Sequence, residues 1–151
     1  HDKNKIGENV KDIIRELNKP ILLVNSEFIT PKKILIAYNG SEESKKILTT
    51  AVRNPIFKDV TRDIVNINDD KLFSEKILDE AKKIYAKSEI DIKTSVLSGD
   101  AKTEILTYMY ENDCDILAMG AFGHSRIKEF IFGSFTSEII AQSKKPILFY
   151  R

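Results

Sequence analysis

Cysteine is nearly absent from this chain, since Cys114 is the single one among 151 residues. One cysteine excludes an intrachain disulfide framework and is typical of a reducing compartment, so we expect a cytoplasmic protein. Cys114 lies at the start of an apolar run that ends at Met119. A free cysteine in such a run is usually buried, and we interpret it as a packing residue rather than a nucleophile.

An excess of charge and long apolar runs are missing as well. The chain has 24 basic and 23 acidic residues, for a formal net charge of +1. A nearly neutral chain gives no electrostatic reason to bind nucleic acid, and no apolar run is long enough to span a bilayer. We therefore expect neither nucleic acid nor a membrane as a partner. No cluster of histidine, cysteine or carboxylate residues has metal-ligand spacing, so no metal centre is indicated.

Short apolar runs alternate regularly with amphipathic segments from residue 33 onward. Ser41, followed by Glu42 and Glu43, is a typical helix start, because the hydroxyl caps free amides and the acids suit the positive helix end. Strands separated by helices imply right-handed crossovers, which predicts an α/β fold with a doubly wound, five-stranded parallel sheet. The predicted strands are 33–38, 60–67, 90–97, 115–119 and 146–150, and the predicted helices are 41–52, 70–88, 101–111 and 134–144.

The front of the chain repeats its end. The segment from Gly7 to Leu22 matches the segment from Gly133 to Leu148, with the glycine, the Ile-Ile pair and the Lys-Pro-Ile-Leu run all displaced by 126 positions (from 7 to 133, and from 20 to 146). Such a repeat indicates that residues 1–30 are the last helix, last strand and linker of a preceding similar domain, and that 31–151 form the main domain. The alternative is an ordinary N-terminal helix and edge strand.

An edge strand at 20–25 has unpaired backbone N–H and C=O groups, and it readily pairs with another strand. Pairing with strand 146–150 is the simplest solution, and the sequence leaves open whether it occurs within one chain or between two. We therefore expect a homodimer, or pairing with a sister domain, through these two strands.

A glycine-rich segment follows the fourth predicted strand. Gly120 and Gly123 allow backbone amides to come close to an anion, and Gly133 with Ser134 opens the last helix, whose free amides favour a phosphate. Arg126 adds positive charge, and we count both Arg126 and His124 among the candidate nucleotide-binding residues. No Lys-Ser or Lys-Thr follows the glycines, so this is not a Walker-type loop.

Three segments together resemble the universal stress protein family, in its ATP-binding branch: Ile34 to Ser41, Met119 to Arg126, and Gly133-Ser134. With the repeat at the front, the chain is similar to the C-terminal half of a bacterial tandem protein of this family. The resemblance implies a Rossmann-like fold of the adenine nucleotide α-hydrolase type. It also implies a site made of Ala37, Asn39, Ile67, Met119, Gly120, Gly123, Gly133, Ser134, Phe135 and Thr136.

In that site the residues have separate implied roles. Ala37 and Asn39 lie beside the adenine and ribose, Ile67 packs on the base, and Met119 closes the pocket. The glycines and Ser134 line the phosphates, with further contacts from Phe135 and Thr136. His124 is the loop side chain to test first for a part in hydrolysis, although a polar loop residue without a special partner is the simpler interpretation.

Asn39 departs from the family, which usually has aspartate at this position. An asparagine carbonyl still accepts a hydrogen bond from a ribose hydroxyl, but it carries no charge to recruit magnesium. The first hypothesis is thus a stress-response regulatory module that binds ATP, with or without Mg²⁺, and hydrolyses it slowly or not at all. The alternative is an interaction and dimerisation module whose nucleotide pocket is vestigial. No catalytic residue is assigned, and we expect valine at both Gly120 and Gly133 to abolish binding.

Overall fold

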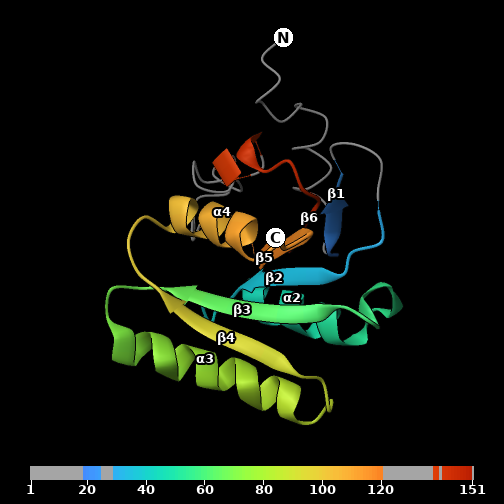
Figure 1. Ribbon diagram of the computed structural model, residues 1–151. Helices are drawn as coiled ribbons and strands as arrows, with labels where there is room; N and C mark the ends of the chain where they lie inside the picture. Colours follow the sequence, from blue (N-terminus) through green and yellow to red (C-terminus); the bar gives the residue numbers. More distant parts are fainter. Residues whose placement is uncertain (1–18, 25–28, 121–137, 140, 151) are drawn as a thin grey trace.

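The computed structural model describes residues 19–24, 29–120, 138–139 and 141–150, which form a six-stranded sheet with helices on both faces (Figure 1). The strand order is β1-β6-β5-β2-β3-β4. The strands are β1 (Ile21–Leu23), β2 (Lys33–Ala37), β3 (Thr61–Ile67), β4 (Ile92–Leu97), β5 (Ile116–Gly120) and β6 (Ile147–Tyr150). The helices are α2 (Glu42–Arg53), α3 (Lys71–Ala86) and α4 (Ala101–Glu111), with a short 3-10 turn η1 (Pro55–Phe57) after α2.

Strands β2 to β6 are parallel to one another, as the alternation of strands and helices predicts. The sixth strand, β1, lies at the edge and pairs antiparallel with β6 of the same chain. The sheet is therefore mixed. The sequence left the partner of strand 20–25 open, and in the structure this strand pairs with β6 of the same chain. Residues 134–137 and 140 of the predicted helix 134–144, and the helix expected before β1, lie outside the described residues; residues 138–139 and 141–142 are helical.

Alternation along the strands sends side chains to two separate apolar cores. Ile34, Ile36 and Ile64 point to the face that α2 and α3 cover. Leu35 and Val65 point to the opposite face, which α4 covers together with Ile139. Because both faces are covered, the central strands are apolar almost throughout, which is why their sequences read as continuous runs.

Polar side chains fix the starts of the three helices. Ser41, Asp70 and Asp100 are the N-caps of α2, α3 and α4, and each accepts a hydrogen bond from the backbone N–H three residues later. The cap on α2 sets where the chain turns after β2, and so it fixes the backbone beside the predicted site at the carboxyl edge of the sheet.

Candidate functional site

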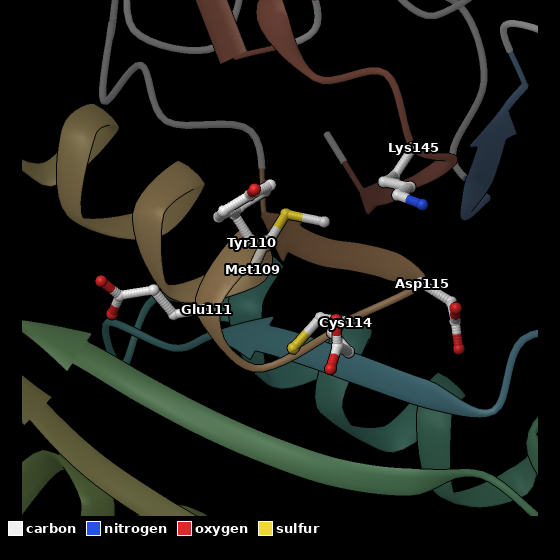
Figure 2. Close-up of a pocket in the computed structure, with 7 residues that line it drawn as sticks. Met109, Tyr110, Glu111, Cys114, Asp115 and Lys145 are labelled. Atoms are coloured by element: carbon white, nitrogen blue, oxygen red, sulfur yellow. The ribbon is translucent and has the colours of Figure 1, made fainter.

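A cavity of about 570 Å³ lies at the amino edge of the sheet, beside the end of α4 (Figure 2). Cys114 lies in its wall, where it is 2% exposed, and burial raises the pKa of its thiol to about 11. The thiol is therefore protonated near neutral pH and is a poor nucleophile. None of the residues that line the cavity is a predicted site residue. They are Met109, Tyr110, Glu111, Asp113, Cys114, Asp115 and Lys145.

The predicted site lies at the other, carboxyl edge, where β2 and β5 are neighbours. Chain connections leave this pair in opposite directions, from β2 toward β3 and from β5 toward β6. In parallel α/β sheets, ligands bind in the crevice outside such a switch point. Ala37 and Met119 are opposite each other at the ends of the two strands, and both are fully buried.

Three of the predicted pocket residues share one face of the sheet. Ala37 and Met119 belong to the apolar core beneath α4, and Ile67, at the end of β3, packs against the same core and is half-buried. The structure thus brings Ala37, Ile67 and Met119 together from three strands. They form an apolar cluster near the carboxyl edge of the sheet.

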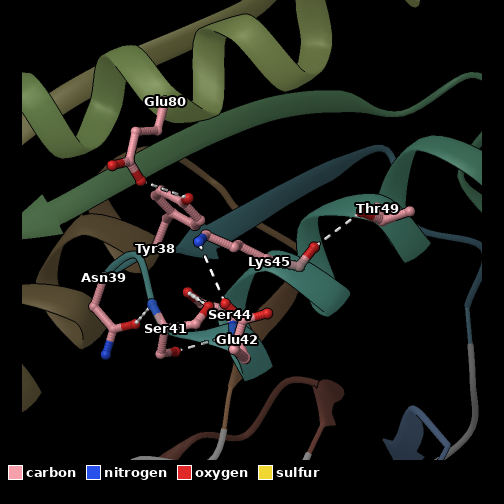
Figure 3. A network of polar contacts seen from close by, with 8 residues as sticks. All are labelled: Tyr38, Asn39, Ser41, Glu42, Ser44, Lys45, Thr49 and Glu80. Atoms are coloured by element: carbon pink, nitrogen blue, oxygen red, sulfur yellow. Dashed lines mark hydrogen bonds and ion pairs between the residues drawn. The ribbon is translucent and has the colours of Figure 1, made fainter.

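The turn after β2 holds Asn39 in one orientation. The Ser41 N–H donates to Asn39 Oδ1 over 3.0 Å, and the Ser44 N–H donates to Ser41 Oγ over 3.1 Å (Figure 3). Because an N–H group must face an acceptor, the first bond assigns the oxygen of the Asn39 amide to the turn. The Nδ2 end, which is a donor, points away from the helix in Figure 3.

Buried polar residues support the backbone immediately before Asn39. Asn66 Nδ2 donates to the carbonyl of Tyr38 over 2.8 Å, and Ser74 Oγ donates to Asn66 Oδ1 over 2.6 Å. The Tyr38 hydroxyl donates to Glu80 Oε2 over 3.2 Å. Burial, and then the charge of Glu80, raise the pKa of Tyr38 to about 12, so this phenol stays neutral. Sequence reasoning missed these partners, and a polar residue inside an apolar strand, as at Asn66, was the available signal.

Gly120 ends β5 directly beneath the first turn of α2. A Cβ atom at this position would lie 2.8 Å from the Ser44 nitrogen, 2.8 Å from Glu43 Cβ and 3.0 Å from the Glu43 carbonyl carbon. Two of these neighbours are backbone atoms of a packed helix, which cannot move aside cheaply. The described contacts thus give Gly120 a packing role that the sequence did not show. Valine at Gly120 would displace α2, so the double-valine test would not separate binding from folding.

The first turn of α2 faces the crevice but is poorly suited to hold phosphate. Its N-cap hydroxyl already accepts the Ser44 N–H, and Glu42 and Glu43 place two carboxylates there. These charges repel an anion that the helix dipole would otherwise attract. This turn therefore gives no support to a phosphate, and the predicted phosphate site remains the glycine-rich segment. Its residues Gly123, His124, Arg126, Gly133, Ser134, Phe135 and Thr136 lie outside the described residues.

Two further findings concern the described part of the chain only. It contains no group of three or more histidine, cysteine or acidic residues placed to hold a metal ion. Among its helices, none is long and apolar enough to cross a membrane.

Comparison with known proteins identifies one family by sequence. The model of the universal stress protein family matches residues 30–151. Universal stress protein Slr1230 of Synechocystis is 33% identical over 148 residues, which cover 97% of this chain and 52% of that protein. Stress response protein NhaX of Bacillus subtilis is 28% identical over 66% of this chain and 58% of its own length. The chain thus spans little more than half of either relative.

Solved structures agree on the fold. A universal stress protein from Archaeoglobus fulgidus superposes with a TM-score of 0.74 at 18% identity, over 90% of this chain and 50% of that one. A universal stress protein in complex with cAMP gives 0.68 at 19% identity, over 82% and 98%. A member from Arabidopsis thaliana with AMP bound gives 0.60 at 14%, over 78% and 89%.

Proposed function

This chain belongs to the universal stress protein family, and on that premise we propose that it is a stress-response module that binds an adenine nucleotide, ATP, at the carboxyl ends of β2 and β5. The observation that carries the proposal is the switch point between β2 and β5. Ala37, Ile67 and Met119 share one apolar core at this edge of the sheet, and Asn39 follows β2 with its amide oxygen fixed by the Ser41 N–H. Two structures of the same fold hold cAMP and AMP, which supports a nucleotide as the ligand.

The proposed binding mode divides the nucleotide among different groups. The adenine packs against half-buried Ile67 at the edge of this apolar core, where burial of its ring removes apolar surface from water. Asn39 Nδ2 donates to an oxygen of the ribose, because Oδ1 is already engaged by the Ser41 N–H. We assign the phosphates to Gly120, Gly123, Gly133 and Ser134, as the glycine pattern of the sequence implies. A neutral amide at position 39 carries no charge to recruit Mg²⁺, so we expect binding without the metal.

We propose binding with slow or no hydrolysis. A general base needs a pKa near the working pH and must lie within hydrogen-bond reach of water at the phosphate. Among the residues at the end of β2 and in the turn after it, Asn39 and Ser41 do not titrate, and the raised pKa of Tyr38 keeps it protonated. None of these three side chains supplies a base.

Calorimetric titration with ATP, AMP and cAMP, each with and without Mg²⁺, tests the proposal. We expect saturable micromolar binding of ATP by the unaltered chain, with little effect of the metal. Asn39→Asp keeps an acceptor for the Ser41 N–H but removes the donor and adds a negative charge. The loss of one hydrogen bond to the ligand weakens binding by about 1 kcal/mol or more, roughly fivefold, in the absence of Mg²⁺.

Asn54→Asp is the matched control. Asn54 Oδ1 accepts the Ile56 N–H over 3.1 Å in a turn of the same kind, at the far end of α2. We expect this variant to bind like the unaltered chain. Absence of heat and of bound nucleotide for the unaltered chain, under all conditions, would refute the proposed function.

One observation favours a second function, an interaction module with a vestigial pocket. The acceptor of Asn39 is already used within its own turn, and the adjacent helix start is acidic, so this wall of the crevice offers a nucleotide little beyond one donor. A folded chain that retains no nucleotide through purification and gives no heat on titration would support this function.

A further inference from the structure

Asn39 is the only asparagine in the chain that a glycine follows. Asn39 and Gly40 lie in the turn between β2 and α2, and both are half-buried, so solvent reaches them. Gly40 has a φ of +79°, in the left-handed region that glycine adopts without strain. The turn thus places a backbone nitrogen that no side chain shields directly after an asparagine amide.

The hydrogen bond within this turn favours attack of the Gly40 nitrogen on the amide carbon of Asn39, Cγ. The Ser41 N–H donates to Asn39 Oδ1 over 3.0 Å. This bond closes a ring that contains both Cγ and the Gly40 nitrogen, so it holds the two reacting atoms on the inside of one turn. It also places a donor at the oxygen that becomes negative during the attack, within the range of about 2.7–3.1 Å that stabilises an oxyanion.

The attacking and leaving groups are both unoccupied in the part of the chain that the structure describes. No residue there accepts a hydrogen bond from the Gly40 N–H or from Asn39 Nδ2. In Figure 3, Nδ2 points away from α2, whereas Oδ1 points to the Ser41 nitrogen. The Gly40 nitrogen is therefore free to lose its proton to solvent, and Nδ2 is free to depart as ammonia.

We propose that Asn39 and Gly40 form a self-modification site, at which the Asn39 amide becomes a carboxylate with water as the only co-reactant. The Gly40 nitrogen gives its proton to solvent and bonds to Asn39 Cγ, while the bond from Cγ to Nδ2 breaks and Nδ2 takes a proton and leaves as ammonia. Water then opens the five-membered imide. Addition of water at Cγ gives aspartate, and addition at the backbone carbonyl of residue 39 gives isoaspartate. Nothing is oxidised or reduced, and the formal net charge falls from +1 to 0.

The modification changes the character of this wall of the crevice. Both products replace the donor Nδ2 with a negative oxygen, in the turn that leads to the carboxylates of Glu42 and Glu43. The modification itself does not depend on nucleotide binding. Its effect on a ligand rests on the proposed function: ATP loses the donor of Asn39 and should bind the modified chain more weakly in the absence of Mg²⁺.

Two other turns of the same chain serve as matched controls. Asn54 and Asn68 each accept, through Oδ1, the backbone N–H two residues later, over 3.1 Å and 2.8 Å, as Asn39 does. Pro55 follows Asn54, and its nitrogen carries no hydrogen to lose. Asp69 follows Asn68, and its side chain crowds the attacking nitrogen. The three asparagines thus share one hydrogen bond and differ in the residue that follows.

Peptide mapping by mass spectrometry tests the proposal on the unaltered, folded chain, incubated in mildly alkaline buffer at body temperature. Trypsin places the three asparagines on separate peptides. We expect the Asn39 peptide to gain about 1 Da, because OH replaces NH₂, and to contain isoaspartate. Asn68 should change severalfold more slowly, and Asn54 not at all. No change at Asn39, or equal rates at Asn39 and Asn68, would overturn the proposal.

The same chain unfolded in urea tests whether the turn takes part. We expect Asn39 to be modified at least as fast in the folded chain, because unfolding removes the Ser41 N–H from Oδ1. Gly40→Ala adds one Cβ beside the attacking nitrogen, 3.2 Å from the flexible end of Ile77, and should slow the modification severalfold. Slower modification in the folded chain than in urea, or an unchanged rate in the alanine variant, would contradict the assigned role of the turn.

Titration with ATP separates the modification from the proposed function. Without Mg²⁺, we expect the fully modified chain to bind ATP roughly fivefold more weakly than the fresh chain. Equal affinities would show that the modification leaves the site unchanged and would overturn its effect on the ligand. A fresh chain that binds no ATP would refute the proposed function, and the gain in mass at Asn39 would still decide the modification site.

Discussion

Replacement of Gly120 by alanine adds a single methyl group at the point where β5 meets α2. The new Cβ would lie 2.8 Å from the Ser44 nitrogen and from Glu43 Cβ, well inside normal contact distance. Since the helix backbone is among the atoms met, relief requires the first turn of α2 to move away from the strand. That turn carries the hydrogen bonds among Asn39, Ser41 and Ser44, so the crevice wall should change with it.

Two opposing terms set the size of the effect. Overpacking of a rigid site costs about 1–3 kcal/mol, and backbone neighbours favour the upper part of that range. Alanine in a strand interior regains about 0.5–1 kcal/mol relative to glycine, because the unfolded chain loses freedom. The net loss is therefore about 2 kcal/mol. For a chain of this size that corresponds to a fall in melting temperature of about 4–8 °C.

Thermal unfolding followed by circular dichroism measures this loss, and amide hydrogen exchange locates it. Exchange should accelerate at Ser44 and its neighbours in the first turn of α2. Gly99→Ala is the comparison variant: its backbone φ of +107° makes alanine costly, but the nearest neighbour of the added Cβ is a flexible side-chain atom 3.5 Å away. It should lower stability without faster exchange in α2. A Gly120→Ala chain that melts within about 1 °C of the unaltered one, with unchanged exchange, would refute the packing role.

Three further outcomes follow from buried groups. The free energy of unfolding should fall as pH rises from about 9 to about 12, because the thiol of Cys114 and three phenols lose their protons at higher pH in the folded state than in the unfolded state. Urea midpoints measured at rising pH would show this fall. The phenols, whose pKa burial raises to about 12, are those of Tyr38, Tyr85 and Tyr108, and the thiol pKa is raised to about 11. Cys114 should react with a thiol reagent only at the rate of unfolding, so faster labelling in the folded state would contradict its burial. Tyr108→Phe removes the donor 2.7 Å from buried Asp63 and should cost about 1–3 kcal/mol by denaturant unfolding, whereas Tyr110→Phe, at an 86% exposed position, should cost almost nothing.

The elements of this fold could be predicted because each carries a local signal. The predicted helix 101–111 coincides with α4, which Asp100 caps. The predicted strand 90–97 begins two residues later in the structure, at Ile92, where the apolar alternation was loose. The partner of strand 20–25 was left open, because sequence similarity between two strands does not say whether they meet within one chain. The register of β1 on β6 supplies that information.

The buried polar residues of β3 could not be predicted in the same way. Arg62 is 3% exposed and donates to the carbonyls of Ala51, Phe57 and Val60, at 2.6–2.7 Å for the three shortest bonds. It thereby satisfies backbone acceptors in the last turn of α2, in η1 and just before β3. Asp63 binds Tyr108 from α4. These partners come from elements far apart in the sequence, so only the assembled fold shows why a strand with polar residues is buried.

At the crevice, folding and binding use the same atoms, and this decides which substitutions are informative. Gly120 is held against α2, and Ser41 and Ser44 hold the turn after β2, so replacing any of them alters the wall as well as any ligand contact. Asn39 differs, because only one of its two amide atoms is used within the fold. Oδ1 accepts the Ser41 N–H, whereas no described residue accepts from Nδ2. Aspartate preserves the first contact and removes the second. If Asn39→Asp melts like the unaltered chain and binds ATP more weakly, the ligand contact is isolated from the fold; if it lowers both equally, Asn39 is a turn residue only.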